Sequence, residues 1–68
     1  MKGYQKEIYR AAGDAAKQLA QGVAAERGGV VTFHPSFAYR GVRPCYVVFS
    51  TLEAAQAAIQ DGAIIVAP

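Results

Sequence analysis

Cysteine and histidine are almost absent from this chain of 68 residues. Cys45 is the only cysteine and His34 the only histidine. An internal disulfide is therefore excluded, and one residue of each type is too few for a structural zinc site. We expect no metal and no other cofactor. A single free cysteine is typical of proteins from a reducing compartment, so we predict a cytoplasmic location.

Long apolar segments are also missing. The longest apolar run, Ala63–Pro68, is far too short to span a bilayer. The first ten residues are polar and charged, unlike a secretory signal. We therefore expect no membrane partner and one domain over residues 1–68. A chain of this size buries only about 60% of its unfolded surface, so oligomerisation or docking onto a partner is the expected source of extra stability.

Acidic residues are few and unevenly placed. Seven lysines and arginines against five carboxylates give a formal net charge of +2, which argues against mimicry of DNA. The segment from Arg27 to Leu52 holds three arginines and no carboxylate. This segment is the expected contact surface for an anionic partner.

The apolar spacing predicts one long helix over residues 4–26, because five apolar residues recur at steps of three and four. These are Ile8, Ala12, Ala15, Leu19 and Val23. The Gly28-Gly29 pair is expected to end this helix. Alanine, the best helix former, fills much of the remaining segment.

The rest of the chain predicts two strands, a helix and a third strand. Residues 29–34 and 45–50 are rich in β-branched and aromatic residues, and a ten-residue loop, 35–44, joins them. Ser50 and Glu53 have the spacing of a capping box, which predicts a helix start at Ser50 and an end before Gly62. The apolar run 63–67 predicts a short buried strand.

The resulting order is α-β-β-α-β, which indicates an α+β fold. We predict a two-layer sandwich whose three-stranded sheet carries both helices on one face. The other face would then be open to water. Either a second copy or a partner protein would cover that face, and either the N-terminal helix or another chain would shield the edge of the sheet. The residues predicted on the open face are Val30, Thr32, His34, Tyr46 and Val48.

Chemistry for catalysis is sparse. His34 and Cys45 are the only candidates for a nucleophile and its base. Strand alternation, with Val31 and Phe33 facing the helices, predicts that His34 and Cys45 lie on opposite faces. No paired carboxylates and no phosphate-binding glycine motif accompany them. We therefore predict a non-enzymatic protein with no catalytic residue.

The loop after His34 is the most unusual surface, because aromatic residues and arginines alternate there with small residues. Tyrosine and arginine dominate binding hot spots and also stack on bases. We predict partner contacts here and on the adjacent strand, by His34, Phe37, Tyr39, Arg40, Arg43 and Tyr46. The alternative is that Phe37 and Tyr39 fold back as a lid over the core while the arginines stay solvated.

A second basic surface is predicted on the first helix, where Lys6, Arg10 and Lys17 fall on one stripe. The alternative is an ordinary solvated face, in which Glu7 and Asp14 pair with Arg10 and Lys17 at helical spacing.

One segment resembles part of a known family. Residues 45–59, and Tyr46, Val47 and Phe49 in particular, are similar to the third strand and second helix of RNA-recognition-motif domains. Pro44 departs from the pattern, because it stands where the family has its first stacking aromatic. This resemblance implies binding of RNA or single-stranded DNA on the sheet.

In size and style, but through no motif, the chain also resembles phage-encoded inhibitors of the anti-CRISPR type. That resemblance implies a small protein that occludes a surface of a host nucleoprotein complex. Three hypotheses follow for the partner: a protein or nucleoprotein complex, a nucleic acid, or a second copy in a structural homodimer.

Overall fold

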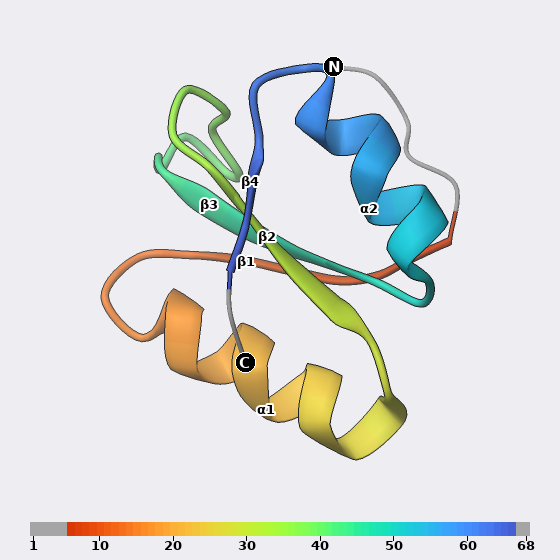
Figure 1. Cartoon of the computed structure of the whole chain (residues 1–68). Helices are drawn as coiled ribbons and strands as arrows, with labels where there is room; N and C mark the ends of the chain where they lie inside the picture. Colours follow the sequence, from red (N-terminus) through yellow and green to blue (C-terminus); the bar gives the residue numbers. More distant parts are fainter. Residues whose placement is uncertain (1–5, 67–68) are drawn as a thin grey trace.

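The computed structural model describes residues 6–66, which fold into two helices and one antiparallel sheet (Figure 1). The element order is β-α-β-β-α-β, and the strand order in the sheet is β1-β3-β2-β4. The α+β class is thus confirmed, but the sheet has four strands rather than three. The elements are β1 (Glu7–Ala12), α1 (Ala16–Arg27), β2 (Val30–His34), β3 (Cys45–Phe49), α2 (Leu52–Ile59) and β4 (Ile64–Ile65).

The additional strand, β1, occupies the first part of the predicted long helix. The prediction of a helix over residues 4–26 is wrong for residues 6–15, of which 7–12 form β1, and residues 4 and 5 lie outside the described part. β1 pairs with β3, and Ala11 of β1 is buried, at 7% exposure. Gly13, at a φ of 99°, separates β1 from the helix. The predicted stop is confirmed, because Gly28 follows α1 with a φ of 72° and donates its N–H to the Ala24 carbonyl.

The N-cap of the second helix lies one residue later than predicted. Thr51, not Ser50, is the N-cap, and its Oγ1 accepts a hydrogen bond of 3.1 Å from the Ala54 N–H. The Ser50 N–H donates instead to the Lys6 carbonyl beside β1. The strand predicted over 63–67 is shorter, since β4 holds two residues and residue 67 is not described.

The two helices lie on opposite faces of the sheet, with the sheet between them (Figure 1). On β3, Cys45, Val47 and Phe49 pack in one core cluster with alanines of α2. Val48, whose side chain points the other way, packs with Ala20 of α1. The predicted two-layer arrangement with both helices on one face is therefore wrong, and the molecule has three layers.

Chain direction explains this arrangement. The β1-α1-β2 crossover passes over β3, and the β3-α2-β4 crossover passes over β2, so both step the same way across the sheet. They begin, however, on strands that run in opposite directions. Because crossovers between parallel strands are right-handed, the two helices must then cover opposite faces.

The predicted open face is consequently absent from the described residues. Thr32 and Val48, which were expected to face water, are both 0% exposed. His34 is 4% exposed. The described residues therefore offer no open sheet face through which a homodimer could form, whereas the outer edge of β1 is not paired with any described strand.

Candidate interaction site

The loop between β2 and β3 contains a small hairpin of its own. Tyr39 and Val42 form an antiparallel bridge, with an N–H to carbonyl distance of 2.7 Å in one direction and 3.1 Å in the other. Arg40 and Gly41 form its tip, with φ values of 54° and 78°. Two positive φ values are the mark of a type I′ turn, in which glycine is favoured. This tip hairpin, residues 39–42, carries Arg40 into solvent.

Arg10 fastens the loop to β1. Its guanidinium donates two hydrogen bonds to the Glu7 carboxylate, of 2.7 Å from Nε and 2.6 Å from Nη2. The Cζ atom also lies 5.1 Å from the ring centre of Phe37 and 5.6 Å from that of Tyr39. The hydrogen bonds to Glu7 raise the pKa of Arg10. A paired, half-buried arginine between two rings gives the loop a fixed position beside the strand.

The loop covers the same face of the sheet as α2, beside that helix. Phe37 and Tyr39 pack on the same core cluster as Cys45 and Ala58. These two half-buried rings therefore lie as the alternative interpretation expected, folded back over the core. Arg40 stays exposed, with its Cζ atom 5.4 Å from the ring centre of Tyr39.

His34 is a buried part of this face rather than a surface group. Its Nε2 lies 2.7 Å from the hydroxyl of Thr32, and that hydroxyl donates to the Val47 carbonyl at 3.0 Å. A hydroxyl has one proton, so Thr32 accepts from Nε2–H and the neutral ring carries its lone pair on Nδ1. Phe37 stacks edge-on against the imidazole at 5.8 Å.

Cys45 stands directly opposite His34 in the β2–β3 ladder. Directly opposed residues of an antiparallel pair point to the same face, so the prediction of opposite faces is wrong. The prediction assumed that the alternating residues of both strands face the same helices. In the structure Val31 faces α1, whereas Val47 faces α2.

Burial decides what this pair can do chemically. Cys45 is 0% exposed, and burial raises the pKa of its thiol. Burial, together with the nearby Arg10 charge, lowers the pKa of His34, while the carboxylates of Glu7 and Asp61 oppose that shift. A buried thiol with a raised pKa is a poor nucleophile. Among residues 6–66, no group of three His, Cys, Asp or Glu side chains is arranged to hold a metal ion.

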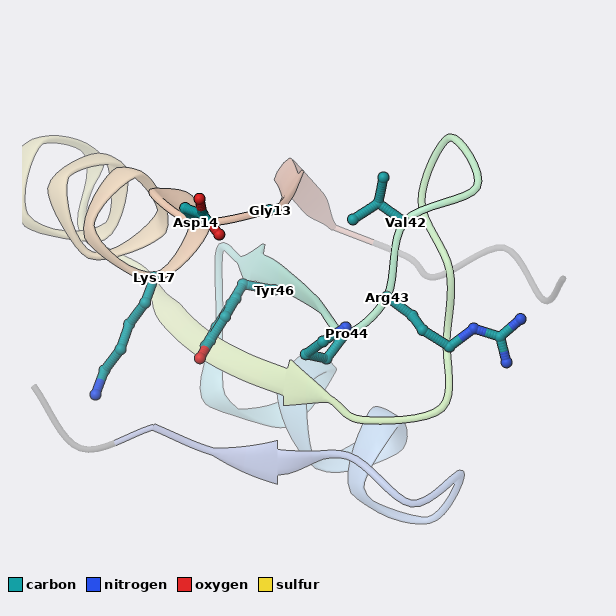
Figure 2. A pocket seen from close by; sticks show the side chains of 7 residues that line it. All are labelled: Gly13, Asp14, Lys17, Val42, Arg43, Pro44 and Tyr46. Carbon is teal, nitrogen blue, oxygen red and sulfur yellow. The ribbon is translucent and has the colours of Figure 1, made fainter.

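Tyr46 lies on the opposite face, beneath the start of α1. Its ring is half-buried and packs on Phe33, with 5.0 Å between ring centres. It lines a hollow of about 280 Å³ between α1 and the end of the loop (Figure 2). In that view the Lys17 side chain lies on one side of Tyr46 and Arg43 extends away on the other. The hollow is lined by Gly13, Asp14, Lys17, Val42, Arg43, Pro44 and Tyr46.

A second hollow, of about 350 Å³, runs along the free edge of β1; we call it the edge hollow. Four consecutive residues of β1 line it. Successive side chains of a strand point to opposite faces, so a hollow lined by consecutive residues follows the backbone edge. The tip hairpin forms the other wall, and Val42 lines both hollows. The lining residues are Tyr9, Arg10, Ala11, Ala12, Tyr39, Arg40 and Val42.

The structure thus regroups the predicted binding residues. Tyr39 and Arg40 line the edge hollow, Arg43 and Tyr46 line the hollow by α1, Phe37 holds Arg10, and His34 is buried.

The predicted basic stripe on one helix is wrong. Lys6 precedes β1, Arg10 lies within it, and only Lys17 is helical. The Glu7–Arg10 pair exists, but it forms within a bulged strand. Sequence reasoning missed Tyr9, Ala11 and Ala12 as lining residues, because their segment was predicted to be a helix. It also missed Val42, an apolar loop residue with no sequence signal for binding.

Comparison with known proteins returned nothing: no family model, no curated protein and no solved structure matches this chain. Neither helix of the described part has the length and hydropathy that a bilayer crossing requires.

Proposed function

We propose that this chain is a non-enzymatic interaction protein that binds its partner along β1 and the tip hairpin. One observation carries the proposal: the edge hollow places the outer edge of β1, with which no described strand pairs, beside an exposed Arg40 and Tyr39, whose ring Arg10 contacts. Unpaired backbone groups, a fixed aromatic ring and an arginine are the features of a binding surface.

The absence of a catalytic role is part of the proposal. His34 and Cys45 are adjacent but buried, and the thiol is held in its protonated form by its surroundings. A nucleophile must reach its substrate, and neither side chain does so from the surface.

The partner we propose is a protein or nucleoprotein complex. The narrower form, an inhibitor of the anti-CRISPR type that occludes a host nucleoprotein surface in the cytoplasm, rests on size and style alone.

A nucleic-acid-binding module is the second candidate. It is supported by the hollow beside α1, where Tyr46 lies near the cations Lys17 and Arg43. Direct binding of RNA or DNA predicts an affinity that falls steeply with salt.

Affinity capture with matched baits tests the proposal. The chain, an Arg40→Asn variant and an Arg27→Gln variant are each immobilised and exposed to lysate of the source organism, with and without nuclease. We expect one partner to be enriched by the parent and by Arg27→Gln, and to be enriched several-fold less by Arg40→Asn. Arg27→Gln is the matched control, because it removes the same charge from a residue that lines neither hollow.

Two results would contradict the proposal. Equal enrichment by all three baits would remove the site assignment, and no enrichment over an empty resin would remove the function itself. Loss of the partner with nuclease, together with a steep salt dependence, would favour the nucleic-acid module.

A further inference from the structure

The partner's chemistry can be read from the edge hollow. We infer that β1 binds an extended, acidic peptide segment, which adds to the sheet as a fifth strand beside Tyr9–Ala12. This inference rests on the proposed function and specifies the partner's conformation and charge.

The backbone supports strand addition. β1 pairs with β3 on one side, and no described strand pairs with its other side. A register shift between Glu7 and Tyr9 marks a bulge, which leaves Tyr9–Ala12 as the regular part of the strand. The same four residues line the edge hollow. At the other edge, β4 has only two residues. β1 is therefore the longer free edge, and unpaired strand edges bind extended peptides through main-chain hydrogen bonds.

The alternation of backbone groups favours a peptide over a nucleic acid. A free strand edge offers N–H donors and carbonyl acceptors in turn. A second peptide strand complements both, whereas phosphate oxygens only accept hydrogen bonds. The carbonyls of β1 would face phosphates without a donor.

The charge of the hollow sets the charge of the segment. Arg10 is neutralised by Glu7, so the exposed Arg40 supplies the outstanding charge of the edge hollow. In the adjoining hollow, Lys17 and Arg43 outnumber Asp14. A segment with carboxylates on the side of the tip hairpin complements this surface.

A second copy of the chain fits the charge less well. The regular part of β1, Tyr9–Ala12, contains no carboxylate. Glu7, the one carboxylate of β1, is held by Arg10. Self-pairing along β1 would therefore leave Arg40 without a partner of opposite charge.

Three synthetic peptides test the inference. The first alternates valine and glutamate, the second carries lysine in place of glutamate, and the third is the first with alternate backbone nitrogens methylated. Methylation keeps charge and side chains but removes the N–H groups that pair with a strand. Binding is measured by NMR titration of the labelled chain.

We expect the glutamate peptide to shift the amide signals of Tyr9–Ala12 and of the tip hairpin. Methylation is expected to weaken its binding more than about tenfold, because several hydrogen bonds are lost. Arg40→Asn should weaken it roughly three- to fivefold, as removal of one exposed ion pair does. Arg27→Gln should leave it unchanged.

Several results would overturn the inference. Equal binding of the methylated peptide would exclude strand addition, and equal binding of the lysine peptide would exclude the charge assignment. Absence of binding by all three would exclude both. Self-association of the chain by sedimentation, abolished by a bulky substitution on β1, would assign the edge to a second copy. If capture by the Arg40-dependent surface succeeds while the peptides fail, the proposed function stands and this inference falls.

Discussion

His34 and Cys45 face each other across the β2–β3 ladder, on the side of the sheet that α2 and the loop cover. Both are almost fully buried, at 4% and 0% exposure. Their surroundings push the two pKa values away from neutrality in opposite directions, so the imidazole stays uncharged and the thiol stays protonated. The most reactive pair in the sequence is thus a packing element of the core.

The buried imidazole makes stability depend on pH. The pKa of His34 is lowered from 6.5 in the folded chain, so the unfolded chain binds the proton first as the pH falls. Above pH 6.5 this group therefore does not reduce the free energy of unfolding. Below pH 6.5 the free energy of unfolding decreases by at most about 1.4 kcal/mol for each pH unit, until the pH reaches the pKa of His34 in the folded chain.

Urea unfolding between about pH 5.5 and 7.5 measures this effect, with His34→Gln as the control. Arg10, Glu7, Asp61 and Cys45 face the ring and remain in the variant. We expect the pH slope to disappear in His34→Gln even if its overall stability is lower. A slope that persists would assign the effect to another group.

The Thr32 hydroxyl should stabilise the fold through its two buried hydrogen bonds. In Thr32→Val, the His34 Nε2–H and the Val47 carbonyl both lose a partner, while the volume of the side chain is kept. We expect a loss of about 1–3 kcal/mol in the free energy of unfolding. Thr32→Ser keeps the hydroxyl and should lose less. Equal losses in the two variants would contradict this account.

The tip hairpin should become more stable when Arg40 is replaced by Asn. Arg40 has a φ of 54°, in a region that side chains other than glycine, asparagine and aspartate adopt at a cost. Asn-Gly is the preferred pair for a type I′ turn. We expect Arg40→Asn to raise the free energy of unfolding by about 0.5–1 kcal/mol. A decrease would show that the contact of Arg40 with Tyr39 outweighs the strain of the turn.

Two glycines should respond to alanine in opposite ways. A Cβ at Gly29 would lie 2.8 Å from the Phe49 carbonyl oxygen and 2.9 Å from a Val48 methyl group, so Gly29→Ala should cost about 1–3 kcal/mol. Gly22, inside α1, has nothing within 4 Å of that position, so Gly22→Ala should stabilise by up to about 1 kcal/mol. Thermal unfolding of both variants checks the pair, and a shift of the same sign in both would contradict the packing at Gly29.

Much of the fold after Gly28 could be predicted from the sequence. The strands at Val30–His34 and Cys45–Phe49 and the helix at Leu52–Ile59 follow from β-branched residues, apolar spacing and a cap. β1 could not be predicted, because alanines favour a helix locally. Pairing with β3 overrides that preference, and only the folded chain supplies this pairing.

Which residues lie on which face of the sheet could not be predicted for a related reason. Alternation places residues on two sides of one strand, but the register between strands decides which sides coincide. The uninterrupted apolar run Val47–Phe49 was a usable signal, since strands covered on both faces lack polar alternation. The same error placed His34 at the surface. Tyr39 and Arg40 were predicted as partner contacts because tyrosine and arginine dominate binding hot spots.

Hydrogen–deuterium exchange of the chain, free and bound to its captured partner, tests the binding surface most directly. We predict slower exchange at Tyr9–Ala12 and at residues 39–43 in the complex, with α1 beyond its first turn and α2 unchanged. Protection confined to α2, β4 or the far end of α1, with Tyr9–Ala12 unchanged, would contradict it.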